Sequence, residues 1–134
     1  MSNALYDLGR EAFLSGSISW SGDTIKAALV DTAVYTVNLA THQFYSSVSS
    51  AVVGTPQTLG TKTVTAGVAD AADVTYTSVT GASCEAIVIY KDTGVAGTSP
   101  LIAYIDTATN LPVTPNGGNI VIQWDNGSNK IFKL

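Results

Sequence analysis

Few residues of this chain have the types and spacing that chemistry requires. Histidine and cysteine occur once each, as His42 and Cys84. A Ser-His-acid triad needs a nucleophile held beside the imidazole, but the sequence has neither a nucleophile elbow nor a glycine-rich oxyanion motif. We expect His42 to lie in a loop or at the surface, and Cys84 to be a small buried hydrophobic residue. The sequence predicts no catalytic residue, and a single cysteine excludes a disulfide within the chain.

Metal and cofactor sites are equally poorly supported. One histidine and one cysteine cannot form a zinc site within one chain. Oxygen ligands for calcium occur at Asp70 and Asp73, and at Asp125, Asn126 and Asn129. These residue types also cap turns through their own backbone, and we favour that interpretation. The glycines of "GVAGTS" and "NGGN" are typical of turns rather than phosphate-binding loops, so we expect no cofactor and no metal.

Acids and aromatic residues offer two further options. Glu85 and Asp106 could approach each other across a sheet as a carboxylate pair, but only weakly. Trp20, Trp124 and six tyrosines could form a platform for sugars. Trp124, however, shares a strand face with isoleucines two and four positions before it, a pattern that favours core packing. The residues therefore favour a binding or structural role over an enzyme.

The composition indicates one folded domain over residues 1–134, with residues 1–16 as a candidate N-terminal arm. Hydrophobic residues make up 46% of the chain and charged residues only 12%, about half the usual ~25%. A chain this hydrophobic is not expected to be disordered. Either a partner covers part of its surface, or neutral polar residues cover the outside, and the sequence leaves both open.

The charge pattern bears on the class of partner. The net charge is −4, and the six basic residues are scattered, with only Lys130 and Lys133 close together. Nucleic-acid binding needs clustered basic residues, so we expect no nucleic-acid partner. The N-terminus lacks the features of a signal peptide, and no apolar run approaches the ~20 residues of a membrane span. We therefore expect synthesis in the cytoplasm and no membrane partner.

The first segment, residues 4–15, has a helical pattern. Its apolar residues fall on one helical face: Leu5, Leu8, Ala12 and Phe13. Asn3 is the expected N-cap and Gly16 the expected residue after the C-cap. Gly9 weakens this helix by about 1 kcal/mol. A helix this short is marginal alone, so it must pack on a surface.

The rest of the chain has mostly strand patterns. Alternation and turn residues predict about eight strands, at residues 17–20, 24–31, 61–68, 73–79, 84–92, 101–106, 119–124 and 130–134. Residues 84–92 are apolar on both faces and are expected to form a central strand. Residues 32–50 are irregular, with a short helix expected within 41–50. The predicted fold is all-β: an antiparallel, jelly-roll-like β-sandwich with a short N-terminal helix.

Several stretches together resemble one group of proteins. These are the opening "ALYDLGREAFLSGSISWSGDTIKAALVD" and the later "VIYKDTG", "SPLIAYID", "LPVTPNGG" and "WDNGSNKIFKL". The chain resembles small structural proteins of tailed-bacteriophage virions, above all the jelly-roll cement (decoration) proteins of capsids. The resemblance implies a homo-oligomer, made in the host cytoplasm, that binds the major capsid protein on the capsid exterior and stabilises the shell without a cofactor. A carbohydrate-binding tail or head-fibre module for host attachment is the alternative.

Two apolar ends of the chain are the candidate inter-subunit contacts. The residues are Leu5, Tyr6, Leu8 and Phe13 near the N-terminus, and Phe132 and Leu134 at the C-terminus. Each end could instead pack within its own subunit, and the sequence leaves that alternative open.

Overall fold

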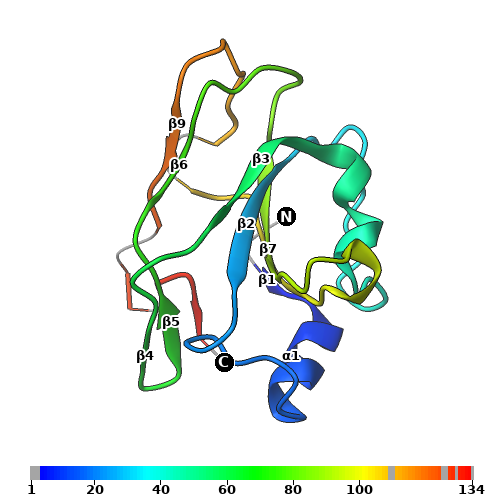
Figure 1. The fold of residues 1–134 in the computed structure, drawn as a ribbon, viewed down its shortest axis with the longest axis vertical. Helices are drawn as coiled ribbons and strands as arrows, with labels where there is room; N and C mark the ends of the chain where they lie inside the picture. Colours follow the sequence, from blue (N-terminus) through cyan, green and yellow to red (C-terminus); the bar gives the residue numbers. More distant parts are fainter. Residues whose placement is uncertain (1–3, 109–110, 125–126, 129, 134) are drawn as a thin grey trace.

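A five-stranded antiparallel sheet forms the centre of the computed structural model (Figure 1), which describes residues 4–108, 111–124, 127–128 and 130–133. Its strand order is β1-β8-β7-β2-β3. The bounds are β1 Ala4–Leu5, β8 Leu101–Ile105, β7 Ala86–Lys91, β2 Ile25–Val30 and β3 Val52–Thr58. The apolar segment expected to be central is β7, the middle strand, and this prediction is confirmed.

Two smaller sheets form a second layer on the left of the central sheet in Figure 1. One has the order β10-β5-β4, and the other pairs β6 with β9. The bounds are β4 Thr63–Thr65, β5 Val68–Asp70, β6 Val74–Tyr76, β9 Ile120–Ile122 and β10 Phe132–Lys133. All strand pairs are antiparallel. The predicted sandwich-like all-β fold with an N-terminal helix is confirmed, whereas the jelly-roll assignment stays a prediction.

Both faces of the central sheet are buried. On β2, Ile25, Ala27 and Leu29 belong to one apolar cluster, and Ala28 and Val30 belong to another. We call the first cluster the strand-covered core, because the two small sheets close it. The second is the loop-covered core, because residues 31–51 close it on the right of Figure 1. Alternate side chains of β2 thus point into the two different cores. For this reason every residue of the strand except Lys26 is buried.

The cover of the second core is irregular. It contains the 3₁₀ turns η1 Tyr45–Ser47 and η2 Ser49–Ala51, and η3 Ala96–Thr98 lies beside η1. In place of one short helix within residues 41–50, the chain thus forms two single 3₁₀ turns that begin at Tyr45 and end at Ala51. A bridge between Phe44 and Pro100 joins this segment to the chain that enters β8.

Three strand predictions need correction. Residues 17–20 form no strand, although Ile18 and Trp20 are buried. Residues 61–68 are not one strand but most of a hairpin that turns at Ala66 (φ 52°) and Gly67 (φ 79°). β3 has no counterpart among the predicted strands. Gly54 (φ 74°) and the nearby proline interrupt its pattern where its pairing with β2 shifts register.

The N-terminal helix α1 spans Asp7–Leu14, shorter than the expected residues 4–15. Ala4 and Leu5 pair with β8 instead, and Tyr6 is the N-cap. Asn3, the expected cap, lies outside the described residues. Gly16 (φ 82°) follows the C-cap as predicted: its N–H donates to the Phe13 carbonyl at 3.2 Å, and the N–H of the next residue donates to the Ala12 carbonyl at 2.8 Å.

Gly9 has a packing role that helix propensity does not show. A Cβ at this position would lie 2.5 Å from the Leu101 carbonyl oxygen and 3.2 Å from the Ile102 Cα. α1 therefore lies almost in contact with the β8 backbone, and only glycine permits this approach. This is the surface that the marginal helix requires.

Candidate functional site

His42 and Cys84 both have structural surroundings. The Nδ1 of His42 lies 2.8 Å from the Tyr35 hydroxyl and accepts the Asn38 backbone N–H at 3.3 Å. Cys84 is fully buried, and its burial raises the pKa of the thiol to about 11. A thiol with a raised pKa is a poor nucleophile at neutral pH, so the geometry gives Cys84 a packing role and His42 a role in holding the loop.

The candidate acids also have structural partners. The Oε1 of Glu85 accepts hydrogen bonds from the backbone N–H and the hydroxyl of Thr32, both at 3.0 Å. The Oδ1 of Asp73 accepts the Trp124 backbone N–H at 3.1 Å. Asp125, Asn126 and Asn129 lie outside the described residues. Within the described ranges, no group of three His, Cys, Asp or Glu residues is placed to hold a metal ion.

None of the helices in the described part of the chain combines the length and the apolar composition that crossing a membrane requires.

The tryptophans lie in the interior rather than on a sugar-binding surface. Trp20 and Trp124 are each 5% exposed, and their indole N–H groups donate to the carbonyls of Asp70 (3.2 Å) and Ala72 (3.0 Å). The core-packing prediction for Trp124 is confirmed. Every phenylalanine, tyrosine and tryptophan lies in the described part of the chain, and each is buried or half-buried.

The six candidate contact residues have different fates. Leu5 and Tyr6 are 5% and 0% exposed in their own subunit. Leu5 packs in the strand-covered core and Tyr6 in the loop-covered core. Both therefore complete the interior of their own chain, the alternative that the sequence left open, and their role as inter-subunit contacts stays a prediction. Leu8, Phe13 and Phe132 are half-buried, and Leu134 lies outside the described residues.

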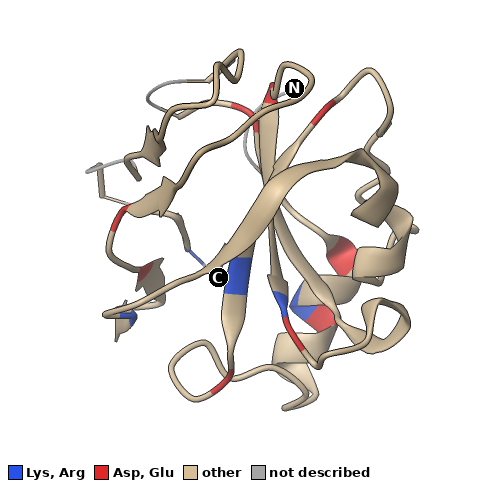
Figure 2. Cartoon of the chain, turned by 45° about the horizontal axis from the view of Figure 1, so that its top comes forward, with Lys and Arg blue, Asp and Glu red and all other residues tan. Residues whose placement is uncertain are grey.

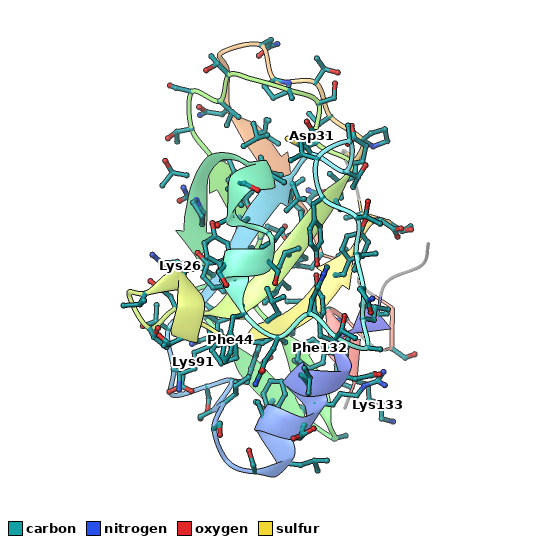
Figure 3. The ribbon with its side chains drawn as sticks, turned by 90° about the vertical axis from the view of Figure 1, so that its right-hand side faces the viewer. Lys26, Asp31, Phe44, Lys91, Phe132 and Lys133 are labelled. Carbon is teal, nitrogen blue, oxygen red and sulfur yellow. The ribbon has the colours of Figure 1, made fainter. Side chains whose placement is uncertain are left out.

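The structure brings the two apolar ends of the chain together. The ring centroids of Phe13 on α1 and Phe132 on β10 are 6.0 Å apart, and Trp20 meets Phe132 edge-on at 5.2 Å. Figure 3 shows Phe132 and Lys133 near α1, at the end of the molecule opposite Asp31. Two aromatic rings from near the N-terminus and one from near the C-terminus thus form one cluster, which is only partly covered.

A shallow groove of about 280 Å³ opens over this cluster. Its lining is mainly apolar: Phe13, Trp20, Val64, Ala69 and Phe132, together with Ser19, Ser21 and Gly67. We call it the end groove. The lining comes from α1 and the segment that follows it, and from the β4–β5 hairpin and β10. The apolar lining makes it a surface that gains by being covered.

Two exposed apolar side chains belong to the elements that line the end groove. Val64 on β4 lines it and is 59% exposed, and Leu14, the last residue of α1, is 85% exposed. The lysines and the arginine are separated along the ribbon in Figure 2 and do not gather on one element. The arrangement suits apolar contact with another protein surface, supplemented by single charges.

Sequence reasoning found only part of this groove. Phe13 and Phe132 were candidates, but on separate ends, because nothing local shows that the ends meet. Leu14 falls outside the predicted apolar face of the helix. This position was the only feature of the sequence that indicated its exposure. Val64 stands between threonines, a pattern that fits a strand but does not distinguish an exposed strand from a buried one.

Comparison with models of protein families finds no match for this chain, and no curated protein sequence matches it.

Proposed function

We propose that this chain is a capsid decoration protein of a tailed bacteriophage. It binds the outer surface of the assembled shell and stabilises the shell through many non-covalent contacts. The resemblance of several stretches to such proteins supports this function, and so does the end groove. The observation that carries the proposal is the partly covered cluster of Phe13, Trp20 and Phe132, with the exposed Val64 in the lining of the same groove.

The polar and reactive groups support a binding role. His42, Cys84 and Glu85 are each engaged in holding the fold, through the hydrogen bonds and burial described above. Threonines flank Val64 on β4, and all three side chains are exposed. A neutral surface of this kind can be covered by another protein without the cost of removing charges from water.

Repetition on a shell makes weak contacts sufficient. A small groove contributes modest affinity by itself, but many copies on a symmetric surface bind with an avidity far above that of one contact. The chain fits this role as a compact unit that adds contacts between neighbouring proteins of the shell.

Copy number is the direct test. In purified virions of the phage that encodes the chain, quantitative mass spectrometry should find hundreds of copies per particle. Particles depleted of the protein should open at a lower temperature than complete particles. A few dozen copies or fewer, together with binding to host glycan, would instead identify a fibre or tail module and contradict the proposal.

A further inference from the structure

β4 is an edge strand with one open side. It is the last strand in the order β10-β5-β4, and no strand of the described residues lies beyond it. All three of its residues are exposed, and Figure 1 shows the β4–β5 hairpin at the lower left of the molecule. An edge of this kind offers backbone N–H and C=O groups to a strand of another chain.

The register of the small sheet shows which backbone groups of β4 face the open side. Ala69 of β5 lies opposite Val64, and its carbonyl accepts the N–H of Ile131 at 3.2 Å, on the side of β10. Opposed residues of an antiparallel pair either exchange two hydrogen bonds or exchange none, in alternation. Because the backbone of Ala69 is directed to β10, Val64 and Ala69 exchange none. The N–H and C=O of Val64 therefore point to the open edge.

Grooves on both faces of this sheet reach the same edge. The end groove lies on the face of Val64, which forms one row across the three strands with Ala69 and Phe132. Neighbouring residues of a strand point to the opposite face, and there Thr63 and Thr65 line a second groove of about 420 Å³, which we call the outer groove. Its lining is Thr63, Thr65, Ala66, Val68, Asp70, Ser128 and Lys130.

The two grooves differ in chemistry. The lining of the end groove is mainly apolar. In the outer groove five of the seven lining residues carry a hydroxyl or a charge, and the single lysine is balanced by the single aspartate. Opposed threonine and serine side chains on neighbouring strands hydrogen-bond to each other, and they bring no charge that must leave water. The outer groove therefore favours neutral hydroxyl side chains.

We propose that β4 binds an extended segment of another protein as an added antiparallel strand, in which apolar side chains alternate with threonine or serine. The backbone of the segment pairs with the N–H and C=O of Val64, as in other cases of strand addition. Its apolar side chains enter the end groove beside Val64, and its hydroxyl side chains lie beside Thr63 and Thr65 over the outer groove. An antiparallel strand matches every strand pair described in this chain.

This inference deepens the proposed function, because it states the chemistry of the segment that the end groove recognises, and it rests on that function for its biological setting. The segment belongs to a protein of the shell. The alternative is an edge strand that only water covers, as in many small sheets whose edges are kept short.

The probe is a synthetic peptide that alternates leucine with threonine, with a lysine at one end and a glutamate at the other for solubility. It is added to the isotope-labelled full-length chain, and the backbone amide signals are followed by NMR. We expect saturable shifts in residues 61–66 and in the linings of both grooves, with a dissociation constant at or below about 1 mM. Unchanged signals with the peptide at about 1 mM would overturn the proposal.

N-methylated peptides distinguish strand pairing from simple apolar contact. In an antiparallel pair the peptide residue opposite Val64 shares its face and exchanges both hydrogen bonds with it. That residue is a leucine, while the N–H groups of the neighbouring threonines point away from β4. N-methylation of the central leucine should weaken binding at least about tenfold. N-methylation of the adjacent threonine is the control and should change the dissociation constant by less than about threefold. Equal effects of the two would contradict strand addition.

Val64→Pro closes the edge from the side of the protein. Proline removes the outward N–H without removing a bond to β5, and edge strands tolerate it at such positions. We expect the peptide to bind at least about tenfold more weakly. Val64→Thr keeps the N–H and a β-branched side chain, so it is the matched control and should bind within about threefold of the wild type. Undiminished binding by Val64→Pro would overturn the assigned edge. If this variant does not fold, the N-methylated peptides decide with the wild type alone.

The copy number per virion separates this inference from the proposed function. Hundreds of copies on the shell with no peptide binding would remove the strand-addition site and leave the decoration role standing. Peptide binding with few copies per virion would do the reverse.

Discussion

The two faces of the central sheet are both buried, but one is covered by strands and the other by an irregular loop. The strand-covered core is closed mostly by aliphatic side chains on regular strands, which pair their own backbone groups. The loop-covered core is closed by residues 31–51, which have little regular structure, and it is richer in tyrosine. The backbone N–H and C=O groups of an irregular segment over a core lack the regular pairing of a sheet and need other hydrogen-bond partners. In residues 31–51, side chains supply some of these partners.

The hydrogen bonds of the loop-covered core form a short chain. The Tyr6 hydroxyl lies 2.8 Å from that of Tyr35, which lies 2.8 Å from the Nδ1 of His42. Because the Asn38 N–H donates to the same nitrogen, Nδ1 is an acceptor and the Tyr35 hydroxyl donates to it. On the other face Tyr76 donates singly, to the Ala27 carbonyl at 2.7 Å. The strand-covered core thus contains single bonds from a side chain to a backbone carbonyl, whereas the loop-covered core contains a chain of linked hydrogen bonds.

The largest expected effect compares adjacent residues on opposite faces of β7. Ile89 is fully buried in the strand-covered core and Val88 in the loop-covered core. Ile89→Ala should lower the free energy of unfolding by about 4 kcal/mol, because paired strands cannot collapse into the cavity. Val88→Ala should lower it by about 2 kcal/mol, because fewer carbon atoms are removed and the covering loop can move into the cavity. Urea unfolding measures both, and equal costs would show that the loop is as rigid as the strands.

The second prediction concerns the contact of α1 with β8. Gly9→Ala should cost about 2 to 3 kcal/mol, because the new Cβ meets the backbone of Leu101 and the helix must move away. This movement also pulls on Tyr6, which precedes the helix and closes the loop-covered core. Gly16→Ala, with nothing within 4 Å of the added Cβ but φ at +82°, is the control and should cost about 1 kcal/mol. A Gly9→Ala protein as stable as the wild type would mean that the close approach is unnecessary.

The third prediction breaks the hydrogen-bond chain of the loop. Tyr35→Phe should lower the free energy of unfolding by about 1 to 2 kcal/mol, since it leaves the Tyr6 hydroxyl and His42 without their shared partner. Hydrogen exchange should accelerate in residues 31–44 while the β2–β7 amides stay protected. Tyr76→Phe removes the matching hydroxyl on the other face and is the control. Its faster hydrogen exchange should appear in strand amides instead. The same exchange pattern in both variants would remove the distinction between the faces.

The fourth prediction is loss of stability in alkali. Burial raises the pKa of Cys84 to about 11 and also raises the pKa of the tyrosines on both faces, Tyr6 and Tyr76 among them. The folded state holds these protons more tightly than the unfolded chain. Stability is therefore full below the unfolded pKa of about 8.5 for cysteine and falls as pH rises through the folded value.

The slope of the free energy of unfolding against pH tests this directly. Each such group contributes up to about 1.4 kcal/mol per pH unit in its window. Cys84→Ala should flatten the slope between pH 9 and 11, whereas Tyr35→Phe should change mainly the steeper part above pH 10. A wild type whose stability is constant to pH 11 would refute the burial of these groups in solution.

The smallest effect lies in the hairpin of the strand layer. Ala66 adopts φ of 52° in the turn between β4 and β5, a region that disfavours alanine. Ala66→Gly should raise the free energy of unfolding by about 0.5 to 1 kcal/mol, because glycine adopts this conformation without strain. Thermal unfolding would detect the gain, and a loss of stability would show that the turn is built differently.

Local pattern predicted the elements whose structure depends on near neighbours. Apolar residues on both faces identified β7 as central, and Gly16 marked the end of α1 at a positive φ. Trp124 was correctly placed inside from its spacing to two isoleucines. In each case a signal within a few residues agreed with the structure, although strands from elsewhere in the chain complete the burial of β7 and Trp124.

The sequence pattern did not predict the elements that depend on distant partners. β3 carries Gly54 and a proline, which read as breakers, yet it pairs with β2 around a bulge. Ala4 and Leu5 continue a helical pattern, but β8 offers a strand edge and takes them as β1. The residue types of 61–68 alternate as they would in one strand. The turn at Ala66 is evident only from its positive φ in the structure.

The sequence by itself thus determined an all-β chain with one short helix, since period and turn chemistry are local properties. Only the tertiary structure decided that the sheet has two differently covered faces and that Phe13 meets Phe132. Tertiary structure also decided that Leu5 and Tyr6 point inward while Leu14 points outward. The physical reason is that burial depends on which distant surface arrives over a residue, and periodicity carries no record of that surface.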